Sequence, residues 1–99
     1  MKAEISHKLK EFFRNKPVNK AYLFGSIVNN KITPGSDIDI LVELDYENGA
    51  NYFVFFDMQQ QLKTLLKRKV DLVSSNGLSS FIKPIIDSEK ELIYERNSF

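Results

Sequence analysis

The sequence contains no cysteine, a single histidine and no long apolar run. The absence of cysteine excludes a disulfide framework and a cysteine-ligated zinc site, and it fits the reducing cytoplasm, where we expect the protein to act. No stretch approaches the roughly 18 apolar residues of a membrane helix, and residues 1–6 show no signal peptide. We therefore expect neither a membrane partner nor a disulfide-stabilised secreted fold.

The sequence also lacks an excess of charge of either sign. It has 14 basic and 13 acidic residues, and its formal net charge is +1. A protein that binds a nucleic-acid backbone usually has a clear basic excess, so nucleic acid is not the favoured partner. The composition, 42% hydrophobic and 27% charged, is that of a globular protein. A chain of 99 residues can bury one modest core, and we expect a single domain over residues 1–99.

Hydrophobic periodicity predicts an alternation of helices and strands. The helices are expected at about 5–13, 26–30, 51–67 and 79–87, and the strands at about 21–24, 37–44, 69–73 and 92–94. Asn51 is a suitable N-cap for the third helix, and Pro84 fits the fourth only if it lies in the first turn. This order predicts an α+β fold, a small mixed β-sheet backed by helices.

Two groups of side chains are assigned structural roles. The basic run near the end of the third helix is interpreted as a solvated helix end: Lys63, Lys67, Arg68 and Lys69. Several phenylalanines are expected to lie mostly in the core, with an exposed patch for a partner as the alternative: Phe53, Phe55, Phe56, Phe81 and Phe99. The lone His7 is expected at the surface.

Asp37 and Asp39 begin the strand predicted over 37–44. Residues two apart on a strand project from the same face, with Cα atoms about 6–7 Å apart, so both carboxylates can bind one cation or bridge a metal pair. Such oxygen ligands select Mg²⁺ or Mn²⁺ over zinc. An isolated Asp-x-Asp is more often a solvent-facing strand end, but the apolar run 40–42 predicts a strand buried on both sides.

Asp71 lies within the apolar strand predicted over 69–73. An unpaired buried carboxylate is energetically costly, so it needs either a cationic partner or a metal. Arg68 or Lys69 would provide a structural ion pair, and a metal shared with the Asp-x-Asp pair is the alternative. The residues alone favour neither.

Gly25-Ser26 follows the apolar strand predicted over 21–24. Free N–H groups at the start of a helix bind phosphate, and glycine allows the phosphate to approach the backbone closely. The Ser26 hydroxyl can donate a further hydrogen bond. The dipeptide is common in ordinary turns, so its significance depends on the strand before it and the aspartates after it.

Residues 23–26 (LFGS), 35–42 (GSDIDILV) and 69–73 (KVDLV) form a specific combination. It resembles the minimal nucleotidyltransferases of the DNA polymerase β-like superfamily over about residues 20–95. The resemblance implies the minimal polymerase β-like nucleotidyltransferase fold. It further implies transfer of AMP from ATP to a hydroxyl group, with release of pyrophosphate.

The resemblance also implies roles for individual residues. Asp37, Asp39 and Asp71 would be catalytic and would bind two Mg²⁺ ions, with Mn²⁺ as an alternative. The nucleotide-binding residues would be Gly25, Ser26, Ser36, Asn29 and Lys31. Many family members continue after Gly-Ser with Arg-Ala-Arg-Gly, whereas residues 27–30 here are Ile-Val-Asn-Asn. Asn29 thus replaces an arginine that would lie beside the phosphates, and Lys31 offers only a point charge without the planar fork of arginine. We expect this difference to affect nucleotide affinity but not the metal site.

The acceptor of the nucleotide is expected to be a separate protein, because the chain has no room for a second domain to hold it. The resemblance implies a HEPN-type partner: minimal nucleotidyltransferases commonly act as antitoxins that adenylylate a tyrosine of a HEPN toxin. Two alternatives stay open. One is a binding module that neutralises its partner by masking it, and the other is nucleotidyl transfer to RNA or a small molecule such as an aminoglycoside. A homo-oligomer is compatible with each of these hypotheses.

Overall fold

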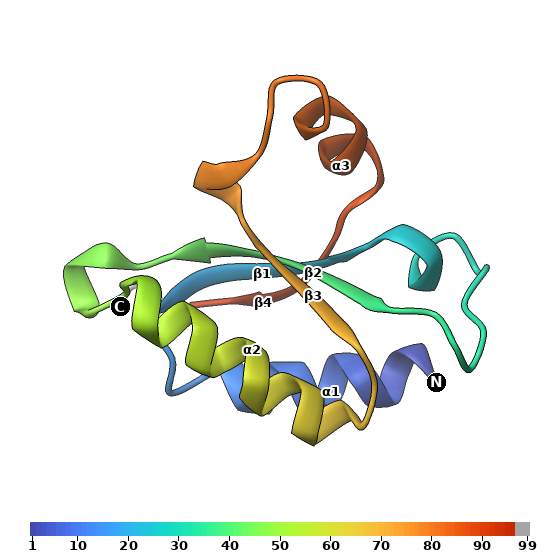
Figure 1. The fold of residues 1–99 in the computed structure, drawn as a ribbon, viewed down its shortest axis with the longest axis horizontal. Coiled ribbons are helices and arrows are strands. Elements are labelled where there is room, and N and C mark those ends of the chain that lie inside the picture. Colours follow the sequence, from blue (N-terminus) through green and yellow to red (C-terminus); the bar gives the residue numbers. More distant parts are fainter. Residues whose placement is uncertain (97–99) are drawn as a thin grey trace.

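A four-stranded sheet with helices on both faces forms the framework of the molecule (Figure 1). The structure is a computed structural model that describes residues 1–96. Along these residues the elements are α1 (Lys2–Phe13), β1 (Val18–Phe24), β2 (Ile38–Leu44), α2 (Tyr52–Leu66), β3 (Val70–Ser74), α3 (Lys83–Glu89) and β4 (Glu91–Glu95). Short 3₁₀ helices follow three of the strands: η1 (Gly25–Ile27), η2 (Tyr46–Asn48) and η3 (Ser75–Gly77).

The sheet is mixed, and its strand order is β3-β2-β1-β4. β1 pairs antiparallel with both β2 and β4, whereas β2 pairs parallel with β3. Parallel neighbours need a long crossover connection, which is supplied here by α2. The predicted α+β class with a small mixed sheet is thus confirmed.

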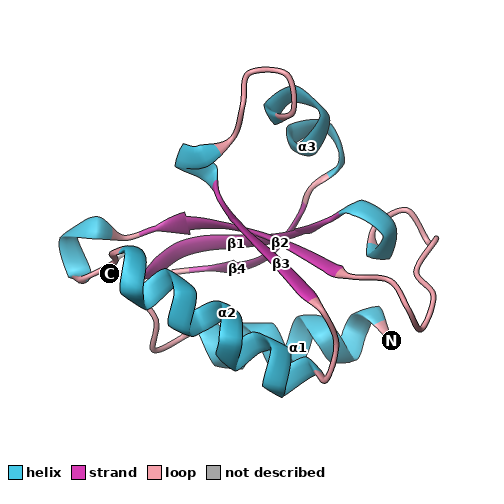
Figure 2. Cartoon of the chain, viewed as in Figure 1, coloured by secondary structure: helices cyan, strands magenta, loops and turns pink. Residues whose placement is uncertain are grey.

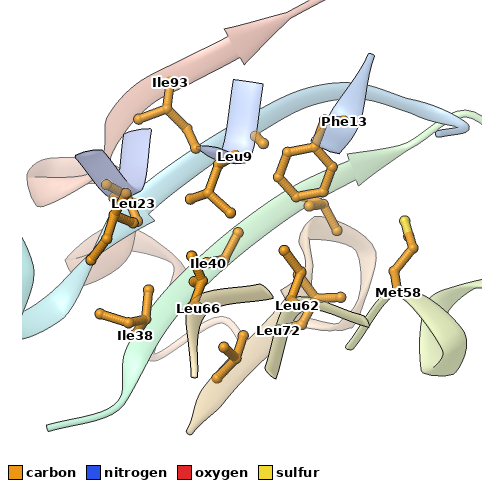
Figure 3. Close-up of a cluster of buried hydrophobic side chains, with 14 of the residues drawn as sticks. Leu9, Phe13, Leu23, Ile38, Ile40, Met58, Leu62, Leu66, Leu72 and Ile93 are labelled. Atoms are coloured by element: carbon orange, nitrogen blue, oxygen red, sulfur yellow. The ribbon is translucent and has the colours of Figure 1, made fainter. Parts of the chain in front are cut away.

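The main core lies between one face of the sheet and helices α1 and α2 (Figure 3). Alternation along β2 directs Ile38, Ile40 and Val42 to this face, as the sequence predicts. Leu9 and Phe13 of α1 are fully buried against them. The core is completed by Leu23, Met58, Leu62, Leu66, Leu72 and Ile93.

A smaller cluster covers the opposite face of the sheet, where α3 lies (Figure 2). Tyr22 of β1, Leu41 of β2 and Ile86 of α3 form its buried centre. Leu41 alternates with Asp39 and Glu43 on β2, so the Asp-x-Asp carboxylates belong to this second face. The candidate site therefore lies on the side of the sheet away from α1 and α2.

The helices begin and end for identifiable reasons. The Asn51 side chain accepts a hydrogen bond from the Val54 N–H at 2.9 Å, which confirms the predicted N-cap of α2, and Lys67 ends that helix in a left-handed conformation (φ 54°). Pro84 lies in the first turn of α3, so α3 begins at Lys83 and not at 79 as predicted. The helix predicted over 26–30 is shorter, the single 3₁₀ turn η1. Among the described residues, no helix has the length and apolarity needed to cross a bilayer.

The prediction that most of the phenylalanines lie in the core is wrong. Phe53 and Phe81 are 84% and 86% exposed, Phe56 is 49% exposed, and Phe55 is half-buried. The centre of the α2 face toward the sheet is filled by methionine and leucine side chains, so Phe55 packs only at the border of the core and Phe53 and Phe56 are exposed. Phe99 lies outside the described residues.

Candidate active site

Two of the predicted carboxylates lie side by side on parallel strands. Asp39 is the second residue of β2, Asp71 is the second residue of β3, and the two are direct partners in the β2–β3 register. Neighbouring strands are about 4.8 Å apart, and paired residues point to the same face. Asp37 precedes β2 by one residue, and its charge acts on Asp39, so all three aspartates lie at the same end of the β2–β3 pair.

The three carboxylates differ in exposure. Asp39 is half-buried, whereas Asp37 and Asp71 are exposed. The assumption that Asp71 is buried is therefore wrong. Its strand, β3, is at the edge of the sheet and has a neighbour on one side only, which leaves Asp71 open to solvent.

The negative charge at this site is not compensated by protein cations. Burial, followed by the charges of Asp71, Asp37 and Glu89, raises the pKa of Asp39 to about 6. Within residues 1–96, the ion pairs include none of these four carboxylates. A group of like charges without a counter-ion is the electrostatic signature of a place that accepts a cation.

The structural ion pair considered for Asp71 does not form. The Arg68 guanidinium donates instead to the carbonyl oxygens of Thr33 and Ser36, the latter at 2.9 Å. Arg68 is half-buried, so it is not part of a solvated helix end. These two bonds hold the loop that leads directly into Asp37. The contact could not be predicted from a local pattern, because 32 residues separate Arg68 from Ser36.

The donor set fits a hard divalent cation such as Mg²⁺, because carboxylate oxygens on one face are its preferred ligands. In the described part of the chain, however, no three His, Cys, Asp or Glu side chains are already gathered as a metal-binding group. The exposed side chains of Asp37 and Asp71 must therefore rotate toward Asp39 to share a cation. The metal-binding role of the three aspartates remains a prediction.

Gly25 makes direct contact with the Asp-x-Asp motif. Its φ of +77° is one that residues with a side chain rarely adopt. A Cβ on Gly25 would lie only 2.2 Å from Asp39 Oδ2, so a side chain has no space there. The contact follows from the antiparallel register, in which Phe24 pairs with Asp39. Glycine is required both by the backbone conformation and by the carboxylate.

The residues after Gly25 form a tight turn, here called the 25–31 turn. The N–H groups of Val28 and Asn29 donate to the Gly25 carbonyl, both at 3.1 Å, and the Lys31 N–H donates to the Ser26 carbonyl at 2.9 Å. The Gly25 N–H instead donates to the side chain of Glu89, at 3.1 Å from Oε1. This N–H is thus directed at an anionic oxygen, as a phosphate-binding turn requires.

Glu89 is a residue of the site that the sequence did not reveal. Its second oxygen, Oε2, accepts a hydrogen bond from the Asn29 side-chain amide at 3.2 Å. Glu89 ends α3 and belongs to no motif, and 64 positions separate it from Gly25. The pairing of β4 with β1 and the packing of α3 on the sheet bring it to the turn.

The remaining predicted nucleotide-binding residues are distributed around the turn. Ser26 is half-buried and Lys31 is exposed. Ser36 closes its own loop: its Oγ accepts a hydrogen bond from the Thr33 N–H at 2.9 Å. The nucleotide-binding roles of these residues stay predictions.

Comparison with known proteins places this geometry in a family. The family model described as "Polymerase beta, Nucleotidyltransferase" matches residues 7–99. A candidate protein adenylyltransferase of Methanocaldococcus jannaschii is 41% identical over 93 residues, which cover 92% of this chain and 91% of that protein. The protein adenylyltransferase MntA of Thermococcus cleftensis is 34% identical over 89 residues, which cover 90% and 85%.

Solved structures agree in fold. A toxin–antitoxin complex with AMP-PNP contains a chain that superposes with a TM-score of 0.78 at 22% identity, covering 93% of this chain and 74% of that one. A complex of tri-AMPylated HEPN toxin with MNT antitoxin from Shewanella oneidensis gives 0.73 at 21% identity, covering 97% and 74%.

The matched residues thus form a nucleotidyltransferase domain, and the solved structures share its fold. Within that class, the chain belongs to the polymerase β-type family and to its minimal nucleotidyltransferases. The predicted family and fold are confirmed.

Proposed function

We propose that this enzyme transfers AMP from ATP·Mg²⁺ to a hydroxyl group, expected to be a tyrosine, of a HEPN-type partner protein, and that it serves as the antitoxin of that pair. The observation that carries the proposal is the contact between Gly25 and Asp39, since it joins an N–H that is directed at an anionic oxygen to a group of uncompensated carboxylates. The relatives named as protein adenylyltransferases and the neighbour complexed with AMPylated HEPN toxin support this choice of acceptor.

Each residue has a distinct task in the proposed reaction. Asp37, Asp39 and Asp71 would hold two Mg²⁺ ions, which when bound neutralise phosphate charge and lower the pKa of the attacking hydroxyl. The Gly25 N–H would bind an oxygen of the triphosphate and orient the α-phosphorus. Asp71, exposed and free of ion pairs among residues 1–96, would accept the proton of the acceptor hydroxyl.

The bonds exchanged are simple. The acceptor oxygen forms a bond to the α-phosphorus of ATP, and the bond from that phosphorus to the bridging oxygen of pyrophosphate breaks. The hydroxyl proton passes to the carboxylate, and the electron pair of the broken bond leaves with pyrophosphate. No redox partner is needed.

A transfer assay tests the proposal. The protein is incubated with ATP, Mg²⁺ and a HEPN-type protein from the same organism, and that protein is analysed by intact mass spectrometry. The expected result is the added mass of one or more AMP groups, on tyrosine, with loss of at least ~100-fold in rate for Asp37→Asn. Asp57→Asn is the matched control, because Asp57 is exposed on α2 and bonds only to Gln61 in the described structure.

The masking hypothesis has one observation in its favour: a protein carboxylate occupies the Gly25 N–H. In that case the partner would be neutralised equally well without ATP, and Asp37→Asn would neutralise it as effectively as the natural protein. Absence of AMP on the partner together with this result would replace the enzymatic proposal by the masking one.

A further inference from the structure

The side chain of Glu89 binds the 25–31 turn in the way an anionic ligand would. One carboxylate oxygen accepts from the Gly25 N–H at 3.1 Å, and the other accepts from the Asn29 amide at 3.2 Å. Both donors come from the segment that would bind the triphosphate in the proposed function. A carboxylate and a phosphate present the same chemistry to such donors, namely negatively charged acceptor oxygens.

The position of Glu89 is electrostatically unfavourable in other respects. It is the last residue of α3, and negative charge at the carboxyl end of a helix opposes the helix dipole. Its charge is also among those that raise the pKa of Asp39. The neighbouring cation, Lys90, does not neutralise it, since its ammonium group binds Asp87 at 2.9 Å and lies 4.4 Å from the centre of the Tyr22 ring.

The hydrogen bonds to Gly25 and Asn29 are therefore the favourable polar contacts of Glu89, and a stronger anion can replace it there. ATP·Mg²⁺ has an advantage that Glu89 lacks, because it brings cations that compensate the charge of Asp39. Glu89 is half-buried and Asn29 is exposed, so the contact can open toward solvent without disturbing the core.

We propose that Glu89 is an internal competitor of the nucleotide: its carboxylate occupies the donors of the 25–31 turn in the nucleotide-free enzyme and leaves them when the triphosphate binds. This inference rests on the proposed function, which it deepens by naming the residue that sets nucleotide affinity. It follows that the natural enzyme binds ATP·Mg²⁺ more weakly than it would if Glu89 did not occupy the donors of the 25–31 turn. Removing the carboxylate should tighten binding, whereas removing an ordinary site residue would weaken it.

The experiment compares the natural protein with Glu89→Ala and Glu89→Gln. Affinity for ATP·Mg²⁺ and for AMP-PNP·Mg²⁺ is measured by titration calorimetry, and the Gly25 amide is followed by ¹⁵N NMR without nucleotide. Glu89→Ala should bind about tenfold more tightly, equivalent to about 1.4 kcal/mol. Glu89→Gln should gain about threefold, because glutamine keeps an acceptor oxygen but not the charge. Glu95→Gln is the charge-matched control, since Glu95 pairs with Lys20, and it should leave affinity unchanged.

The outcomes separate this inference from the proposed function. Equal or weaker nucleotide binding in both Glu89 variants overturns the inference, as does a Gly25 amide signal that does not move in Glu89→Ala, whatever the transfer assay shows. Tighter nucleotide binding without AMP transfer to the partner would support the inference and overturn the proposed function. A complete absence of nucleotide binding in every variant would overturn both.

Discussion

Replacing Gly25 by alanine should destabilise the protein more than the same change at any other glycine. Two effects add at this position. The backbone must keep a φ of +77°, and the new Cβ would be placed 2.2 Å from Asp39 Oδ2. At Gly49 only the first effect exists, because φ is +100° and nothing lies within 4 Å of a Cβ. At Gly35 neither exists.

The comparison of these three glycines gives the expected loss in the free energy of unfolding for each alanine variant. A left-handed conformation costs a residue with a side chain about 1–2 kcal/mol, which is the expected loss for Gly49→Ala. Displacing a close neighbour adds typically about 1–3 kcal/mol, so Gly25→Ala should lose roughly 2–5 kcal/mol of the free energy of unfolding. Gly35→Ala should be nearly neutral.

Urea denaturation of the three variants at pH 7.5 without divalent cations measures these differences. A double-mutant cycle then identifies the clash. Asp39→Ala removes the obstructing carboxylate, so Gly25→Ala should cost only the conformational term in the Asp39→Ala background, with a coupling of about 1–3 kcal/mol. Equal losses for Gly25→Ala and Gly49→Ala, with no coupling to Asp39, would refute the reasoning that the glycine is required by the carboxylate.

Three further outcomes are expected. Without divalent cations at pH 8, Asp39→Asn should stabilise the protein by about 1–2 kcal/mol: the pKa rise from 3.8 to about 6 corresponds to roughly 3 kcal/mol before solvent screening. Because the raised pKa favours the protonated form in the folded state, this gain should vanish below about pH 4, and Asp57→Asn should give no gain at either pH in thermal melts. Burial and its hydrogen bond raise the pKa of Tyr22 to about 12, so the stabilising contribution of Tyr22 is complete below pH 10 and lost toward pH 12. Tyr22→Phe should therefore flatten the fall in the free energy of unfolding between about pH 9 and 11.5. An unchanged slope would contradict this expectation. Arg68→Met should cost about 1–2 kcal/mol and weaken Mg²⁺ binding measured by calorimetry, whereas Lys69→Met should do neither.

Features set by local patterns could be predicted from the sequence. Alternation along residues 38–44 correctly separated the core face of β2 from the face with Asp39, because the period of a strand is fixed by its geometry. The cap at Asn51 was predictable for a similar reason, since it involves a partner only three residues away. The parallel strands then bring Asp71 beside Asp39.

Features set by the tertiary arrangement could not be predicted in this way. The contact of Glu89 with Gly25 and that of Arg68 with the loop before Asp37 join segments that are far apart in the sequence. The exposure of Asp71 depends on β3 being an edge strand, which a single-strand pattern does not reveal. The hydrophobicity of Phe53 likewise did not reveal that this side chain is exposed, because other side chains already fill the centre of the α2 face toward the sheet.

The parallel pairing of β2 with β3 limits where this chain can change its length. Asp39 and Asp71 both lie near the start of their strands, and the connection leaves from the opposite end of β2. An insertion beside Gly49 would extend a remote loop and leave the two carboxylates paired. One extra residue between Lys67 and Val70 that shifted the strand would turn Asp71 to the other face of the sheet, toward the main core. The length of the connection between α2 and β3 therefore determines whether Asp71 lies on the same face of the sheet as Asp39.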